Sequence, residues 1–109
     1  MKLLSRTEEF LLLAILALGE DAYGIPIRKH LYELTGKKYS IGAVYVPLER
    51  LEARGLLSSY ETEPTPERGG RSKRCYQVSA KGISALEEIW QLNKTIWKSF
   101  PAAQTMAYS

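Results

Sequence analysis

The sequence is poor in cysteine, in histidine and in long apolar runs. Cys75 is the only cysteine, so neither an intrachain disulfide nor a cysteine-based metal cluster can form, which fits a reducing cytoplasm. The longest apolar run, residues 10–19, is shorter than the roughly 20 residues needed to cross a bilayer. It also lacks the small-residue cleavage site of a secretory signal. We therefore expect a cytoplasmic protein with no membrane partner.

Residues suited to catalysis are scarce as well. His30 is the only histidine, and a solvated or half-buried side chain is favoured for it over a catalytic base. Cys75 has no histidine near it in sequence, so an inert strand residue is favoured over a redox sensor. The sequence contains no phosphate-binding glycine loop, paired-carboxylate signature or metal-ligand cluster. We expect a protein that is not an enzyme and that needs no metal and no cofactor.

The composition is that of a globular protein, with 45% hydrophobic and 25% charged residues. A chain of 109 residues can bury only a modest core, and association with another chain would enlarge it. The net charge of +3 weakly favours an anionic partner.

Capping and glycine signals predict the first two helices. Ser5 followed by Glu8 forms a capping-box pattern, which predicts a helix over residues 6–18. A second helix is expected over residues 21–36, with its final glycine as the C-terminal cap. The expected buried face of the second helix is Ile27, Leu31 and Leu34.

A third helix is predicted to begin after Ser40, a good N-cap, and to end at Gly55. At about 100° per residue, the side opposite its apolar stripe carries almost no long charged side chain in the first turns. Such side chains normally cover an exposed helix face. Pro47 removes one helical hydrogen bond, so we expect a bend there. The expected buried stripe is Ile41, Val44, Leu48 and Leu51.

The bare side of the third helix would let a bulky partner approach closely. Gly42 and Ala43 leave backbone N–H groups accessible, which favours phosphate, and a B-DNA major groove of about 12 Å admits a helix. Tyr45 is placed to reach a phosphate, and Val46 to touch a thymine methyl group. Small side chains are also common where two helices pack closely, so this pattern alone leaves that alternative open.

Two extended segments, residues 56–63 and 73–79, are joined by a loop rich in proline and glycine, which predicts a β-hairpin. The hairpin carries a basic group that would bind phosphates in a salt-dependent way, although a solvated loop is the alternative. This group consists of Arg68, Arg71, Lys73 and Arg74, and a second one of Arg28, Lys29, Lys37 and Lys38.

The order of these elements predicts the fold class, mainly α with a small β-hairpin. Three helices followed by a basic hairpin form the layout of a winged helix-turn-helix. In that layout the third helix enters the major groove and the hairpin lies along the neighbouring backbone or minor groove. We expect this DNA-binding domain to cover residues 1–79.

A long C-terminal dimerisation helix is predicted over residues 80–100, after the N-cap Ser79, and residues 101–109 are expected to be a disordered tail. Its apolar positions recur at seven-residue intervals, as in helices that pair with each other. Two tryptophans would give a monomer a large apolar patch, so we expect a homodimer, with Asn93 fixing the register. The expected interface is Phe10, Leu13, Leu86, Ile89, Trp90, Asn93, Ile96, Trp97 and Phe100.

A set of short motifs extends from about residue 11 to residue 89. They are Tyr23-Gly24, Gly42, Val44-Tyr45, Pro47-Leu48, Arg50-Leu51-Glu52, Gly55-Leu56-Leu57, Gly70-Arg71, Tyr76, Val78-Ser79, Gly82 and Leu86. In this combination they resemble the PadR-like transcriptional regulators. The resemblance implies a bacterial, cytoplasmic, homodimeric DNA-binding regulator, usually a repressor. It also implies that Tyr45 contacts the DNA backbone and that the region of Gly70 and Arg71 forms the wing.

The chain departs from the common family pattern in two ways. Ser79 stands where threonine is usual, an exchange between two good N-caps. After the wing there is one long helix, which resembles the short-form branch, sometimes found beside genes for export permeases. Some short-form relatives hold flat aromatic drugs in a cleft lined by tryptophan. Trp90 and Trp97 are therefore candidate ligand residues, with packing in the dimer interface as the alternative.

The expected function is sequence-specific binding of double-stranded DNA by a homodimeric repressor. Its site would be a near-palindromic operator of a nearby gene, such as an efflux permease, and a small aromatic effector would relieve repression. A winged-helix module that binds another protein is the alternative. The residues expected to contact DNA are Lys38, Tyr39, Ser40, Gly42, Ala43, Tyr45, Val46, Arg50, Arg68, Gly70, Arg71 and Lys73.

Overall fold

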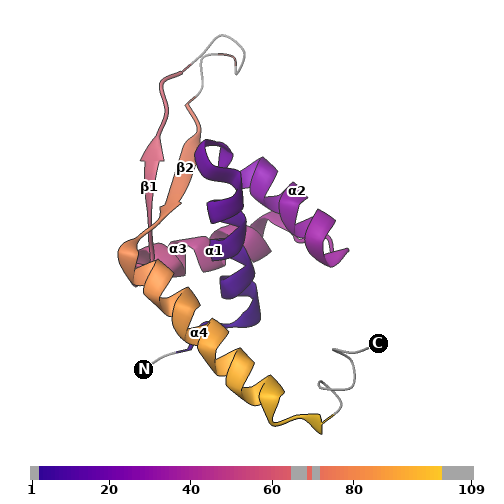
Figure 1. Ribbon diagram of the computed structural model, residues 1–109. Helices are drawn as coiled ribbons and strands as arrows, with labels where there is room; N and C mark the ends of the chain where they lie inside the picture. Colours follow the sequence, from indigo (N-terminus) through magenta and orange to yellow (C-terminus); the bar gives the residue numbers. More distant parts are fainter. Residues whose placement is uncertain (1–2, 65–68, 70–71, 102–109) are drawn as a thin grey trace.

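The computed structural model describes residues 3–64, 69 and 72–101, which form four α-helices and one antiparallel hairpin (Figure 1). The predicted fold class is confirmed, and so are the bounds of the first helix. Most of the predicted wing loop, and the predicted tail from residue 102 onward, lie outside the described residues. The elements are α1 (Arg6–Leu18), the 3-10 turn η1 (Gly19–Asp21), α2 (Gly24–Thr35), α3 (Ile41–Ala53), β1 (Leu57–Glu61), β2 (Arg74–Val78) and α4 (Ala80–Lys98).

Helices α1, α2 and α3 pack around one hydrophobic core. Burial of a side chain the size of leucine contributes about 1.5 to 3 kcal/mol, so this core holds the three helices firmly. One side of α3 packs into this core, and its other side remains at the surface. The largest fully buried helical side chains are Leu11 and Leu12 of α1, Ile27 and Leu31 of α2, and Val44, Leu48 and Leu51 of α3.

Helix α2 begins at Gly24, not at residue 21 as the sequence predicted. Tyr23 is extended, with φ −128° and ψ 176°, and pairs with Cys75 of β2. The Tyr76 N–H also donates a 2.8 Å hydrogen bond to the Ala22 carbonyl. The prediction was wrong at this end because the pairing draws residues 22–23 into the sheet, beside β2.

Two side chains that were predicted to be buried are exposed. Leu34, near the end of α2, is 64% exposed, and Ile41, the first residue of α3, is 60% exposed. Each has the right helical phase but lies beyond the part of its helix that the core covers. Pro47 is buried instead. Helix α3 (Ile41–Ala53) continues through Pro47, so the proline does not interrupt the helix.

Strands β1 and β2 pair antiparallel along their whole length, although both are shorter than the segments predicted from the sequence. Beyond the last pair, the Thr62 N–H donates to the Lys73 carbonyl at 2.9 Å. The Lys73 N–H donates to Thr62 Oγ1 at 3.2 Å. These two bonds fix the backbone of Lys73 near the outer end of the described hairpin.

Helix α4 starts at the base of the hairpin and projects away from the three-helix core (Figure 1). Its predicted N-cap is confirmed, since Ser79 Oγ accepts a 3.1 Å hydrogen bond from the Gly82 N–H. Within α4, only Gly82 and Leu86 are buried, so the helix is attached by its first two turns. The molecule is accordingly elongated, with extents of 56 × 30 × 22 Å.

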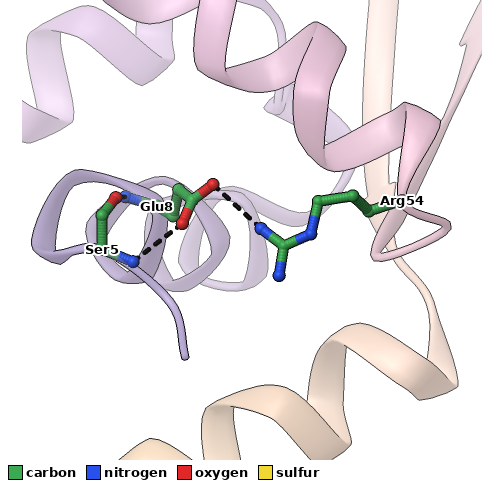
Figure 2. A network of polar contacts seen from close by, with 3 residues as sticks. All are labelled: Ser5, Glu8 and Arg54. Carbon is green, nitrogen blue, oxygen red and sulfur yellow. Dashed lines mark hydrogen bonds and ion pairs between the residues drawn. The ribbon is translucent and has the colours of Figure 1, made fainter. Parts of the chain in front are cut away.

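A polar network joins the start of α1 to the end of α3 (Figure 2). Glu8 Oε1 accepts from the Ser5 N–H at 2.7 Å, and Ser5 Oγ accepts from the Glu8 N–H at 3.1 Å, which confirms the predicted capping box. Arg54 Nη1 donates to Glu8 Oε2 at 3.0 Å. One half-buried carboxylate therefore caps α1 and also fixes the end of α3.

Replacing Arg54 with methionine should lower the free energy of unfolding by about 1 to 2 kcal/mol. The change removes a charge-assisted hydrogen bond and leaves the Glu8 carboxylate without this donor. Arg6→Met is the matched control, because its ion pair with Glu9 is exposed, and its cost should stay below about 0.5 kcal/mol. Urea denaturation of both variants measures the difference, and equal stabilities would contradict the role given to Arg54.

Candidate nucleic-acid interface

The first turns of α3 present an open surface. Ser40 caps the helix as predicted, its Oγ accepting from the Ala43 N–H at 3.1 Å. Gly42 and Ala43 are exposed, and a Cβ added to Gly42 would have no atom within 4 Å. Val46, one turn further along, is also exposed. No part of the described chain covers the face that was predicted to enter a major groove.

A groove of about 500 Å³ lies along one side of this surface. Lys37, Lys38 and Arg50 line it, and none of the three forms an ion pair with a described carboxylate. The acid that lines the groove, Glu8, is already bonded to Arg54. The groove therefore carries net positive charge beside the open face. Its other lining residues are Ser5, Thr7, Tyr39, Ser40, Ala43 and Pro47.

Tyr39 was predicted to contact DNA, but its side chain is only 9% exposed and belongs to the core. Its carbonyl accepts a 3.2 Å hydrogen bond from Arg28 Nε, which holds the loop before α3. An apolar residue just before an N-cap often packs against the fifth residue after it, here Val44, in a hydrophobic staple. That pattern was present in the sequence and would have placed Tyr39 in the core.

Tyr45 lies at the edge of the open face and is partly exposed. Its hydroxyl packs against Gly24, the first residue of α2, and a Cβ at Gly24 would overlap it. The neighbouring Tyr76 is buried, which raises the pKa of its phenol above the ordinary value and keeps it neutral. Sequence reasoning found Gly24 only as part of a motif and missed its contact with Tyr45.

Two members of the predicted basic group, Arg74 and Lys73, lie in the described part of the hairpin and have different partners. Arg74 is held by protein groups, because Nη2 lies 3.3 Å from Glu52 Oε1 and Nε donates to Ser59 Oγ at 3.1 Å. Lys73 instead places its Nζ 4.2 Å from the centre of the Tyr23 ring. The other predicted contacts of the wing, Arg68, Gly70 and Arg71, lie outside the described residues.

Helix α4 carries an exposed apolar stripe in its C-terminal half. Trp90, Ile96 and Trp97 are 57%, 54% and 54% exposed, and Phe100, two residues beyond the end of α4, is 50% exposed. The rings of Trp97 and Phe100 meet edge to face at 6.0 Å. On α1, Leu13 is exposed as well.

The remaining residues of the predicted interface lie closer to the core of the subunit. Phe10 and Ile89 pack partly against it, and Asn93 is half-buried. Leu86 is buried in that core, which corrects its placement in the interface, because little of its side chain is left for a partner. Leu16, an exposed residue of α1, was not named by the sequence pattern.

Cysteine, histidine and acidic side chains are the residues that could form another kind of site. Cys75 is buried in β2, and His30 is half-buried on α2. Among the residues that the structure describes, no group of histidine, cysteine and acidic side chains is arranged to hold a metal ion. Within those residues, no helix combines the length and apolarity required to span a bilayer.

The arrangement defines a winged helix-turn-helix protein: three helices, a hairpin directly after the third, and a short extended segment before α2 that pairs with the hairpin. The family model described as the transcriptional regulator PadR-like family matches residues 12–88. The chain belongs to this family, and it is therefore a DNA-binding transcriptional regulator and not an enzyme.

Solved structures of family members share the fold. A PadR-like transcription factor from Bacteroides fragilis is 31% identical with a TM-score of 0.62, and the match covers 81% of this chain and 84% of that one. A PadR family transcription regulator from Clostridium difficile is 21% identical, with a TM-score of 0.65 and coverages of 88% and 98%. A PadR family transcriptional regulator from Eggerthella lenta is 24% identical with a TM-score of 0.64, and the match covers 83% of this chain and 79% of that one. No curated protein matches the chain significantly.

Proposed function

We propose that this regulator is a homodimeric repressor in which each subunit inserts α3 into the major groove of a near-palindromic operator. The observation that carries the proposal is the open face of α3, where Gly42, Ala43 and Val46 are exposed. Small side chains allow the helix backbone to come close to the base edges. Two α3 helices related by a two-fold axis would read half-sites about 34 Å apart.

Contacts to the DNA backbone are available on both sides of this face. At about 100° per residue, Arg50 and Tyr45 lie on opposite flanks, with Val46 between them. Lys38 adds a cation on the side of Arg50, and Lys73 of the hairpin is the matching cation for the Tyr45 side. Contacts of this kind position a protein on the duplex, while base contacts specify the sequence. Arg68, Gly70 and Arg71 complete the proposed interface from the wing.

Dimerisation is proposed to use the apolar stripe of α4. Trp90, Ile96 and Trp97 project from a helix that the subunit itself leaves largely uncovered, and the exposed Phe100 lies two residues beyond its end. Several large apolar side chains exposed near one another are unusual on a monomer and favour a partner. The exposed leucines of α1, Leu13 and Leu16, supply a second apolar surface for the α4 helix of the other subunit.

Binding to a labelled duplex from the region upstream of the protein's own gene should weaken steeply with salt. With six or more phosphate contacts in the dimer, the affinity should fall at least about a thousandfold between about 50 and 200 mM salt. Gel shifts across a salt series measure this fall. A flat response, or no shift at low salt, would favour the alternative in which exposed Ile41 and Val46 contact another protein.

Tyr45→Ala should reduce affinity for the same duplex about tenfold to a hundredfold, because the dimer loses a backbone contact at each half-site. Tyr32→Ala is the matched control, since Tyr32 is an exposed tyrosine of α2 outside the proposed interface. The dimer should persist in both variants. Unchanged affinity of Tyr45→Ala would argue against placing α3 in the groove.

We also propose that a small aromatic effector relieves repression at the tryptophans of α4, and that the regulated gene encodes an efflux permease. Trp90 lines a groove of about 820 Å³ with Glu87 and Glu88, and the Lys94 ammonium lies 4.3 Å from the centre of its ring. A planar ligand would have to displace Lys94 in order to stack on that face. Tryptophan fluorescence titrated with planar cationic dyes measures stacking, and an unchanged signal across such dyes would leave Trp90 and Trp97 as packing residues.

A further inference from the structure

Two of the proposed DNA contacts meet the same dipeptide. Lys73, from the hairpin, lies over the ring of Tyr23, and the hydroxyl of Tyr45, from α3, lies against Gly24. Tyr23 and Gly24 are consecutive, at the junction between the extended segment and α2. Side chains from two elements far apart in the sequence are therefore located by one short segment.

Both the backbone and the side-chain ammonium of Lys73 have partners within the subunit. Its backbone is fixed by two hydrogen bonds with Thr62, and its Nζ rests 4.2 Å from the centre of the Tyr23 ring. No carboxylate among the described residues lies within ion-pair distance of it, whereas the adjacent Arg74 is bonded to Glu52. An ammonium over an aromatic face is attracted to the ring without being neutralised. Lys73 therefore keeps its charge available while its position is restricted.

The position of the Tyr45 side chain depends on the absence of a side chain at Gly24. Its hydroxyl occupies the space that a Cβ on Gly24 would take. Any other residue at this position would have to push the phenol away, toward the solvent or along α3. Backbone conformation does not require this glycine, because Gly24 is absent from the glycines with positive φ. The requirement at Gly24 is therefore one of space for Tyr45.

We propose that Tyr23 and Gly24 are positioning residues for DNA binding, which align Lys73 of the hairpin and Tyr45 of α3 on one stretch of DNA backbone. The inference rests on the proposed function, because both aligned groups are proposed backbone contacts. Tyr23 and Gly24 act through these groups and need not touch DNA. Restricting a long side chain before binding reduces the entropy that association would otherwise cost.

The salt dependence of binding to the upstream duplex tests the role of Tyr23. The plot of log affinity against log salt has a negative slope. Lys73→Ala should make this slope less steep by about 0.9 per subunit, the value for one lost phosphate contact. Tyr23→Leu, which keeps Lys73 but removes the aromatic face, should reproduce at least half of that decrease. Tyr23→Phe keeps the face and should restore the wild-type slope. Tyr32→Leu, a matched change on α2, should have no effect.

A double-mutant cycle tests the role of Gly24. Gly24→Ala should weaken binding about tenfold when Tyr45 is present, as expected for loss of one backbone contact at each half-site. In a Tyr45→Ala background, where the overlapping hydroxyl is gone, Gly24→Ala should cause no further loss. Thermal melting of each variant identifies any that fail to fold, and the Tyr23 series then decides the question on its own.

The outcomes separate this inference from the function on which it rests. If the wild-type protein does not bind the duplex, the proposed function and the inference both fail. If the wild-type protein binds with a steep salt dependence but Tyr23→Leu keeps its slope, the inference alone is overturned. Equal losses from Gly24→Ala with and without Tyr45 would likewise overturn it, since they would show that Gly24 does not act through the phenol.

Discussion

Replacing Trp97 with glutamate is expected to convert the proposed dimer into monomers, raising its dissociation constant by about a hundredfold to ten-thousandfold. Each large apolar side chain removed from water contributes about 1.5 to 3 kcal/mol, and a two-fold interface contains two copies. A carboxylate at this position would also have to be buried without a partner charge, which adds to the loss. Sedimentation velocity or light scattering over a dilution series measures the change.

Gln91→Glu is the matched control, because it adds the same negative charge at an exposed polar position of the same helix. That variant should remain a dimer at concentrations where Trp97→Glu dissociates. The monomer should also lose tight operator binding, since it can occupy only one half-site at a time. A stable Trp97→Glu dimer would show that the apolar stripe of α4 is not the interface.

Replacing Gly82 with alanine should lower the free energy of unfolding by about 3 kcal/mol, which is the upper end for overpacked sites. A Cβ there would overlap the Leu56 carbonyl oxygen, a backbone atom that cannot rotate away, and would crowd Val78. For a domain of this size, the melting temperature should fall by more than about 10 °C. Scanning calorimetry measures it.

Gly42→Ala is the corresponding control for Gly82→Ala. Gly42 is also in the first turn of a helix, but a Cβ added there meets no atom within 4 Å. Alanine is a better helix former than glycine by up to about 1 kcal/mol, so this variant should be as stable as the wild type or slightly more so. Equal melting temperatures for the two variants would contradict the packing described for Gly82.

Local signals in the sequence predicted most of the fold correctly. The N-caps Ser5, Ser40 and Ser79 are all confirmed, because a hydroxyl that accepts from the third residue of a helix is a short-range contact. Prediction failed where a distant segment competed with a local preference. The start of α2 is displaced by pairing between Tyr23 and Cys75, residues far apart in the sequence.

The candidate site shows the same division between local and distant contacts. The open character of Gly42 and Ala43 followed from helix periodicity, because each element's own phase decides which side faces the core. Leu86 was misplaced because periodicity gives the direction of a side chain but not the extent of the core, whereas the burial of Tyr39 had a local signal in the sequence, the hydrophobic staple before α3. The contacts of Tyr23 with Lys73 and of Gly24 with Tyr45 join separate elements, so no local pattern could reveal them.

The attachment of α4 to the end of α3 has a mechanical consequence. The carbonyls of Arg54 and Gly55 accept hydrogen bonds from Lys81 Nζ at 2.9 Å and Ser79 Oγ at 2.6 Å, and the Leu56 carbonyl accepts from the Ser79 N–H at 3.1 Å. These bonds couple the end of α3 to the start of α4, so a rotation of α3 is transmitted to α4. At 1.5 Å per residue, α4 is roughly 28 Å long, so a rotation of about 10° displaces its far end by about 5 Å. In the proposed dimer, the angle at which the two α4 helices cross would therefore affect the separation of the two α3 helices, and with it the spacing of the half-sites that the proposed operator must have.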